Sequence, residues 1–549
     1  MRFSAAALRG DLYGGITAGI VALPLALAFG EASGAGPIAG LWGAILVGFF
    51  ASLLGGTPTN VSGPTGPMVV VFAGVFASLS GQPELVVASV VLAGLIQIAM
   101  GVFGIGQYIR LVPYSVVSGF MSGIGVIIIA LQVSRLFGHE PDEGGTIPAL
   151  QKIPEAVLDP VWAALIVGLV CLLIVFTWPK SWGRFLPGPL VALIAGTLIS
   201  LALNAVMATP APILGDIPRG FPDFQRPALS RDTLFVIFEA AIILALLGAI
   251  DSLLTSLVAD NMTRTRHNSN RELFGQGVGN TLAGLFGAVP GAGATMRTVV
   301  NIRTGGRTRL SGIIHSLLLL ATVISLAPLA EAIPHAVLAG ILIKVGYDII
   351  DWSYLRVAHR GPRWDLLLMA LVLLLTVFVD LITAVAAGVV LAALAFVKQI
   401  ADAQLAQFGS TAERPEDPEE RALLEQAGHR VTMFEFRGPL SFGAAADMGH
   451  RVRERADADS EYLLLDFSGL PAIDLSAARA VEDIFYDSRQ SGKRVYISGM
   501  NGPVRDTLAN LRADHSLPDD AHYPTRVEAL RAIVRKLGGR PAALETAAS

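Results

Sequence analysis

Long apolar runs separated by short polar loops fill the chain from its N-terminus to about Lys398. A membrane-spanning helix needs about 20 apolar residues, and the pattern predicts about fourteen spans on that basis. We place them at 12–30, 38–55, 67–79, 84–103, 113–133, 160–177, 187–206, 233–258, 273–287, 296–303, 311–329, 335–349, 365–379 and 382–399. The spans 67–79 and 296–303 are short, and each follows a glycine-rich stretch.

The pattern changes after Lys398. Residues 407–428 are charged and contain prolines, which is typical of a linker. Strand-like runs then alternate with helix-like stretches, and this alternation predicts a small α/β domain. The strands are expected at 430–437, 461–467 and 493–498, and the helices at 475–490, 503–513 and 525–537. We therefore predict a transmembrane domain over 1–406, a linker over 407–428 and a soluble domain over 429–549.

Composition agrees with a membrane protein. Of the 549 residues, 53% are hydrophobic and only 15% are charged, which indicates a polytopic membrane protein rather than a soluble one. The formal net charge of −4 gives no support for nucleic-acid binding. The single cysteine, Cys171, excludes an intramolecular disulfide. The sequence has no Walker run, zinc-ligand spacing or nucleophile elbow, so no enzymatic activity is expected.

Basic residues in the loops predict the orientation of the chain. With the N-terminus inside, more of the Lys and Arg residues fall in the inner loops than in the outer ones, among them Arg264, Arg266 and Arg271. Cytoplasmic loops carry this excess. Both termini are therefore expected in the cytoplasm.

Two glycine-rich stretches interrupt the apolar pattern at corresponding places in the two halves of the membrane part. One reads GPTGPM over 63–68, and the other reads GAGATM over 291–296. Irregular backbone at membrane depth is tolerated only where it is buried in protein or lines a cavity. Such a pair in the two halves of a chain points to the binding site of a transporter. The alternative interpretation is tight helix packing through small residues.

Asp251 and Thr255 lie one helical turn apart inside an apolar span. An ionisable group in a membrane span is costly, so it is a candidate functional residue by default. The spacing puts both side chains on one helix face, and carboxylate and hydroxyl oxygens suit a hard cation such as Na⁺. The alternative is a buried aspartate that is protonated or bonded to a neighbouring helix.

The residues at the two predicted helix starts favour an anion. Gly293, Ala294 and Thr295 precede the short basic helix, and small residues let a ligand approach the backbone. Thr65 and Gly66 hold the matching position in the first half. Free N–H groups at helix N-termini attract anions. Two such helix starts that face each other would form an anion pocket.

Two basic residues within predicted spans have two interpretations each. Arg297 either supplies positive charge to the pocket or extends to the cytoplasmic face. Lys344 either extends to the membrane interface or pairs with a neighbouring helix. Long basic side chains near span ends commonly reach for water.

These motifs resemble those of the SulP/solute-carrier-26 anion transporter family over nearly the whole chain. The stretches that carry the resemblance are GDLYGGITAGIVALPLALAFG (10–30), GTPTNVSGPTGPM (56–68), AIDSLLTSLVADNMTRTRHNSNRELFGQGVGN (249–280) and VPGAGATMRTVVNIRTGG (289–306). Within that family, the chain most resembles the BicA-type sodium-dependent bicarbonate transporters. The features that carry this closer resemblance are Asp251, Thr255 and GAGAT at 291–295. LLLDFSGLPAIDLSAARA (463–480) resembles the STAS domain of bacterial anti-sigma-factor antagonists.

The resemblance implies an α-helical membrane domain built as a seven-plus-seven inverted repeat, with a UraA-like core and gate, followed by a cytoplasmic STAS domain. It implies a homodimer in the bacterial inner membrane that imports bicarbonate with Na⁺ by an elevator movement, without an enzymatic cofactor. The implied Na⁺ ligands are Asp251, Thr255, Gly293, Ala294 and Thr295. Bicarbonate or another small oxyanion is expected near Thr65, Gly66, Ala294, Thr295 and Arg297. Gly66 is included because it lies at the predicted start of the first short helix.

Four points stay open. Gly63 stands where the BicA-type run carries glutamate, so the polarity of the pocket rim and the identity of the anion are undecided. Proton-coupled transport of sulfate or a dicarboxylate, in which Asp251 titrates, is the alternative function. A membrane-anchored STAS signalling protein is a second alternative. Ser476 keeps the hydroxyl of the phosphorylatable serine in those antagonists, or it caps a helix.

Overall fold

The computed structural model divides into two compact units, Met1–Ala392 and Ala393–Ser549. The residues it describes are 5–79, 82–107, 113–141, 146–179, 182, 186–207, 209–215, 220–228, 233–379, 381–407, 409–410, 417–438, 440, 448, 452, 454, 460–510 and 519–538. Some positions used in the sequence analysis lie outside the described residues. They include the loop residues Arg110 and Arg184 and residues 408 and 411–416 of the predicted linker.

The first unit is helical, and a helix lies at each predicted apolar segment, with the last of these helices continuing past Ala392 into the second unit. In chain order these helices are α1 (Ala5–Ala32), α2 (Pro37–Leu54), α3 (Gly66–Ser78), α4 (Pro83–Val102), α5 (Tyr114–Leu136), α6 (Thr146–Leu158), α7 (Trp162–Thr177), α8 (Gly188–Asn204), α9 (Leu234–Thr263), α10 (Ser269–Leu285), α11 (Thr295–Arg303), α12 (Arg309–Ala330), α13 (His335–Ile349), α14 (Trp352–Val357), α15 (Arg363–Phe378) and α16 (Leu381–Gln407).

The apolar pattern did not reveal α6. This helix carries charged residues, including the Lys152–Glu155 ion pair, and a 113° bend separates it from α7. In the described part of the chain, five helices are long and apolar enough to cross a membrane by themselves, or up to six when the bent α6–α7 pair counts as one span. The chain is therefore a polytopic membrane protein, and the total of about fourteen spans stays a prediction.

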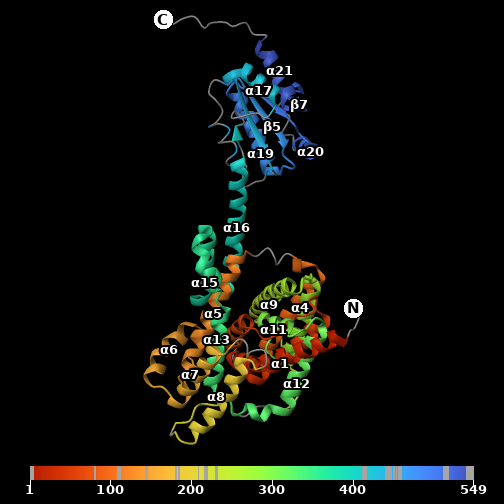
Figure 1. Cartoon of the computed structure of the whole chain (residues 1–549). Helices are drawn as coiled ribbons and strands as arrows, with labels where there is room; N and C mark the ends of the chain where they lie inside the picture. Colours follow the sequence, from red (N-terminus) through yellow and green to blue (C-terminus); the bar gives the residue numbers. More distant parts are fainter. Residues whose placement is uncertain are drawn as a thin grey trace. The chain divides into compact units, whose positions relative to one another are not determined.

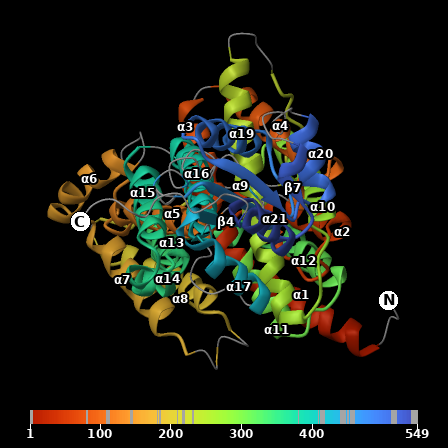
Figure 2. The same cartoon turned by 90° about the horizontal axis from the view of Figure 1, so that it is seen from above.

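The helices of the first unit form two groups, which Figure 1 and Figure 2 show side by side. The first helix group holds α1 to α4 and α9 to α12, and the second helix group holds α5 to α8 and α13 to α15. Contacts of α1 with α8 and α13, and of α3 with α5, join the groups. Because the two groups draw on both halves of the sequence, each half contributes to the surface between them.

Two very short strands cross at the centre of the first helix group. β1 (Ser62–Gly63) pairs antiparallel with β2 (Ala292–Gly293), so that Ser62 lies opposite Gly293 and Gly63 opposite Ala292. All four residues are buried. The pairing satisfies backbone groups that neither interrupted segment could satisfy alone inside a membrane.

The second unit contains a five-stranded sheet in the order β3 (Gly409–Ser410), β4 (Val431–Arg437), β5 (Tyr462–Gly469), β6 (Arg494–Ser498), β7 (His522–Tyr523). β4 to β7 are parallel, and β3 is antiparallel to β4. The three predicted strands coincide with β4, β5 and β6. β3 and β7 have two residues each, which is too short for a periodic signal.

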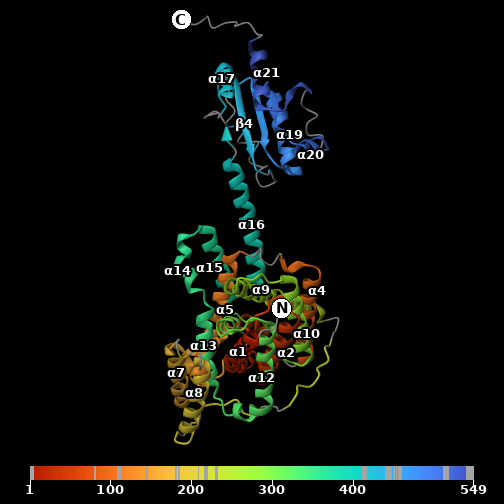
Figure 3. The ribbon, with the colours of Figure 1, turned by 45° about the vertical axis from the view of Figure 1, so that its right-hand side comes forward.

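Helices cover both faces of this sheet (Figure 3). α19 (Leu475–Gln490) and α20 (Gly502–Asn510) pack on one face, and α17 (Pro418–Ala427) and α21 (Arg526–Gly538) pack on the other. α17 lies within the stretch 407–428 that reads as a linker.

Side chains of the second unit correct one expectation and add an ion-pair network. Asp474, not Ser476, caps α19, because its carboxylate accepts from the Ala477 N–H at 2.8 Å. Ser476 is exposed. On α21, Arg526 Nε donates to the buried Asp466 at 2.8 Å, and its guanidinium also pairs with Glu435. Burial acts to lower the pKa of Arg526, but these carboxylates raise that pKa above its ordinary value.

Candidate functional site

The two broken segments place two helix starts beside each other. α3 begins at Gly66 after Thr65, and α11 begins at Thr295 after Ala294, each directly following its strand of the β1–β2 crossing. The Val69 N–H donates to the Thr65 carbonyl and the Thr298 N–H to the Ala294 carbonyl, both at 2.9 Å, which begins each helix. The first N–H groups of a helix have no acceptor within it, so both starts can donate to a ligand.

One face of α9 connects both helix starts. Thr65 Oγ1 donates to Asp251 Oδ2 at 2.7 Å. One turn further along α9, Thr255 Oγ1 donates to the Gly293 carbonyl at 2.8 Å and lies 2.7 Å from Thr295 Oγ1. The structure thus brings together carboxylate, hydroxyl and carbonyl oxygens that lie far apart in the sequence. Hard cations such as Na⁺ prefer oxygen donors of this kind.

Three further predicted residues complete this arrangement in different ways. Ala294 uses its N–H for the Val61 carbonyl at 2.9 Å, so that N–H group belongs to the strand crossing. Gly66 is buried, and a Cβ there would lie 2.5 Å from Ile349 Cδ1 of the second helix group. Thr295 is exposed, which leaves it open to a ligand.

Arg297 does not extend to the cytoplasmic face. The residue is only 2% exposed, and its Nη2 donates to the Pro64 carbonyl beside β1. Two residues before it, Thr295 lies on the opposite, exposed side of α11. Among the described residues, no hydrogen-bond partner lies within reach of Arg297 Nε or Nη1. The residue therefore supplies a buried positive charge behind the two helix starts.

Sequence reasoning missed several polar residues that support the site. Ser252 Oγ accepts from the Gly293 N–H at 3.0 Å. The Asn280 side chain holds Gly291 on both sides, with its Oδ1 accepting from the Gly291 N–H at 2.8 Å and its Nδ2 donating to the Gly291 carbonyl at 2.9 Å. Both are buried polar residues inside predicted spans, and a polar side chain at membrane depth is the sequence signal that could have identified them.

Glu272, a further residue that the sequence analysis missed, accepts four hydrogen bonds. Its Oε2 accepts from the N–H groups of Gly56 and Thr57 at 2.9 and 2.8 Å, and its Oε1 accepts from Asn60 Nδ2 at 2.7 Å and Gln276 Nε2 at 3.0 Å. The carboxylate is 1% exposed and receives charge-assisted hydrogen bonds from the loop that leads into β1. This contact fixes the first broken segment from behind.

A cavity of about 570 Å³ lies between the two helix groups next to the site. Met296 and Arg303 of α11 line one side, and Lys344 and Asp348 of α13 line another. Lys344 pairs with Asp348 on its own helix, and its Nζ lies 5.4 Å from the ring centre of Phe176. Met296, in the first turn of α11, is the lining residue nearest in sequence to the site, and Thr295 itself does not line this cavity.

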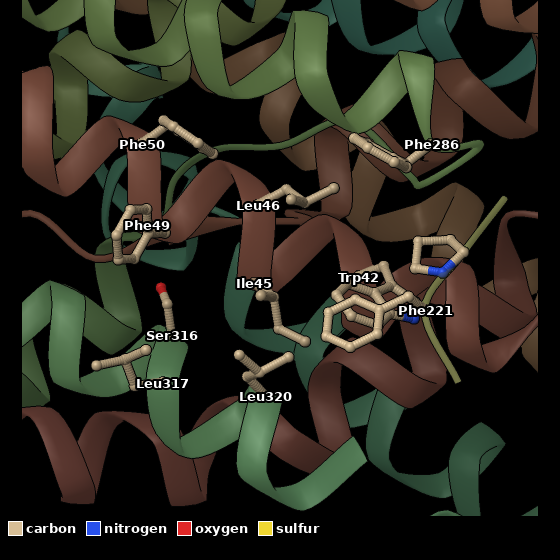
Figure 4. Close-up of a pocket in the computed structure, with 11 residues that line it drawn as sticks. Trp42, Ile45, Leu46, Phe49, Phe50, Phe221, Phe286, Ser316, Leu317 and Leu320 are labelled. Atoms are coloured by element: carbon tan, nitrogen blue, oxygen red, sulfur yellow. The ribbon is translucent and has the colours of Figure 1, made fainter. Parts of the chain in front are cut away.

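A second cavity, of about 410 Å³, has a different character (Figure 4). Aromatic and aliphatic side chains of α2 and α12 line it, including Trp42, Phe49 and Leu320, together with Phe221 and Phe286. Ser316 is the only hydroxyl among its described lining residues. This lining suits an apolar group and offers little to an anion.

The fold and the site together define a membrane transporter, and comparison with known proteins names its family. The model of the sulfate permease family matches residues 8–372, and the STAS domain model matches 424–529. The chain therefore belongs to the sulfate permease family of anion transporters, with a C-terminal STAS domain, and is not an enzyme.

Individual relatives agree with this assignment. The chain is 43% identical to the bicarbonate transporter BicA of Synechocystis, over 97% of this chain and 95% of that protein. The solved transmembrane domain of a cyanobacterial bicarbonate transporter BicA is 49% identical, with a TM-score of 0.66, over 70% of this chain and 99% of that one. The murine solute carrier 26 family member A9 in its inward-facing state shares the fold, with a TM-score of 0.81 at 18% identity, over 97% of this chain and 92% of that one.

Proposed function

We propose that this protein imports bicarbonate together with Na⁺ as a secondary active transporter. The observation that carries the proposal is that Asp251 and Thr255, on one face of α9, contact both helix starts through Thr65, Gly293 and Thr295. Na⁺ would bind oxygens of Asp251, Thr255, Gly293, Ala294 and Thr295. Bicarbonate would lie between the starts of α3 and α11, near Thr65, Gly66, Ala294 and Thr295, with Arg297 as a buried countercharge.

The proposed coupling follows from charge. An ionised Asp251 opposes an anion at the adjacent helix starts, and Na⁺ bound to Asp251 removes that opposition. Each ligand then raises the affinity of the other by the same factor. Bicarbonate as the anion is supported by the identity shared with proteins named as bicarbonate transporters.

The larger architecture is part of the same proposal. We infer a seven-plus-seven inverted repeat with about fourteen spans, in which the first helix group is the mobile core and the second is the gate. The core would slide against the gate as an elevator, and the cavity between the groups would open to one side of the membrane. We further infer a homodimer in the bacterial inner membrane with both termini in the cytoplasm.

Uptake of labelled bicarbonate into proteoliposomes, with and without an inward Na⁺ gradient, tests this function. The wild-type chain should accumulate bicarbonate only with Na⁺, and Asp251→Asn should abolish that dependence because the amide cannot offset the charge of Na⁺. Glu239→Gln changes a carboxylate near the start of the same helix and should transport normally.

Sulfate and fumarate belong in the same assay. If a pH gradient drives their uptake and Na⁺ has no effect, the proposal fails, and Asp251 acts as a proton carrier. If Asp251→Asn keeps the Na⁺ dependence, the ion lies elsewhere and the coupling argument is wrong.

A further inference from the structure

A cluster of four ionisable side chains joins the two helix groups at a place distinct from the transport site. Glu31 lies in the last turn of α1, in the first helix group. Arg135 lies in the last turn of α5, Glu140 follows that helix, and His335 begins α13, all in the second helix group. Glu31, Glu140 and His335 each offer one ligand atom, and these atoms lie within 4.8 Å of one another.

The orientation of the His335 ring is unusual for a neutral histidine. Its Nε2 lies 3.2 Å from the Ile213 carbonyl oxygen, and since a carbonyl can only accept, Nε2 carries the proton. The lone pair of a neutral ring would then lie on Nδ1. That buried nitrogen faces Glu31 Oε1 at 3.1 Å and Glu140 Oε1 at 3.5 Å. A lone pair directed at two carboxylates is repelled unless a proton or a metal cation lies between them.

We propose that Glu31, Glu140 and His335 Nδ1 form a site for a divalent transition-metal cation of the zinc type. Ligands at 2.0–2.1 Å from a tetrahedral zinc ion lie about 3.3 Å apart, and the two nitrogen–oxygen distances of 3.1 and 3.5 Å bracket that value. One nitrogen and two carboxylate oxygens leave a fourth position for water. The Nε2–H contact with a backbone carbonyl is the usual outer contact of a metal-bound histidine.

Arg135 sets the charge and the orientation of the site. Its Nε donates to Glu140 Oε2 at 2.8 Å, which leaves Oε1, the oxygen nearer to His335, available to a metal. Its Nη2 lies 3.9 Å from Glu31 Oε1. Two carboxylates and one guanidinium give a net charge of −1, so a divalent cation is attracted, but less strongly than it would be without Arg135. A proton on Nδ1 is the competing occupant, because it neutralises the same cluster.

A cation here would link α1 to α5 and α13. This consequence rests on the proposed function, in which the two helix groups move against each other. A metal that binds both groups would favour the arrangement seen here and slow transport. The binding itself needs no transport and can be measured separately.

Calorimetric titration of tag-free, full-length protein with Zn²⁺ at about pH 7.5 tests the site. The same titration is then repeated at about pH 5.5, which is below the ordinary pKa of histidine. We expect one Zn²⁺ per chain, and binding at least about tenfold weaker in His335→Ala and Glu140→Gln. Glu140 is largely exposed, so its substitution leaves the packing intact. His139→Ala removes a neighbouring half-buried histidine, whose Nε2 lies 2.6 Å from the Asp159 carbonyl oxygen, and should bind as the wild type does.

Weaker binding at the lower pH in the wild type supports Nδ1 as a ligand, because a proton competes for it. If neither substitution weakens Zn²⁺ binding, or if the wild type binds none, the cluster is an ion-pair network only and the proposal is wrong. Inhibition of uptake by Zn²⁺ in the wild type but not in Glu140→Gln supports the link between the helix groups. A chain that binds Zn²⁺ but transports no bicarbonate contradicts the proposed function and leaves the metal site standing.

Discussion

Single hydroxyl groups hold the helix starts of this transporter to α9. Thr65 contacts Asp251, and Thr255 contacts both Gly293 and Thr295. The positions of Asp251 and Thr255 one turn apart could be predicted from the sequence. Their partners could not, because the contacts join residues separated by 38 to 186 positions.

Thr255→Val tests the hydroxyl with little change in shape. Valine removes both contacts and leaves the Gly293 carbonyl without its side-chain donor, a loss of about 1–3 kcal/mol. We expect the Na⁺ concentration for half-maximal bicarbonate uptake to rise roughly tenfold or more. Thr255→Ser keeps the hydroxyl and should stay near the wild-type value. Equal Na⁺ dependence in the valine variant would remove Thr255 from the proposed sodium site.

Gly63 has a structural reason to lack a side chain. Its φ of 147° is one that L side chains rarely adopt, and a Cβ there would lie 2.7 Å from Arg297 Nη1 and 3.0 Å from Ala44 Cα. With glycine instead of the glutamate expected from the BicA-type run, the space beside Gly63 is filled by the Arg297 guanidinium.

We expect Gly63→Ala to lower the free energy of unfolding by about 1–3 kcal/mol through backbone strain and to displace Arg297. Thermal unfolding followed by size-exclusion chromatography measures the effect. Gly74→Ala on α3, where a Cβ meets no atom within 4 Å, should be neutral or slightly stabilising. Equal stability of both variants would show that neither the backbone conformation at Gly63 nor its contact with Arg297 requires glycine.

At the scale of elements, the pattern identified the apolar helices of the membrane part and the three main helices of the α/β domain, but it did not identify every element. α6, β3 and β7 were missed because charged residues or two-residue length hide their periodicity. The β1–β2 crossing was also invisible, although its two glycine-rich stretches were recognised as a pair. Strand pairing between distant segments leaves no local signal.

Glu272→Gln tests how the first broken segment is held. The carboxylate accepts from four donors, whereas an amide has one oxygen and turns its NH₂ group toward N–H donors. We expect faster hydrogen exchange at residues 56–60 and a stability loss of about 1–3 kcal/mol. Unchanged exchange would show that the β1–β2 pairing alone fixes this loop.

At the scale of the whole molecule, the chain consists of two compact units, and each has buried hydrophobic clusters of its own. A solved transmembrane domain alone matches 70% of this chain. We therefore expect a chain that ends at Gln407 to stay folded and to keep Na⁺-dependent bicarbonate uptake. Size-exclusion chromatography and the proteoliposome assay measure this. Loss of uptake in a well-folded truncated chain would assign the STAS domain a direct part in transport.

The sequence by itself determined the membrane character, the apolar helices, the α/β domain and the residues around Asp251 and the two glycine-rich stretches. Each of these rests on local periodicity or on the cost of polar groups in an apolar span. Only the tertiary structure decided that Arg297 is buried, that Lys344 faces a cavity and that Glu272 and Asn280 support the broken segments. Packing between distant helices decides whether a long polar side chain reaches water or a partner, and local sequence does not encode that packing.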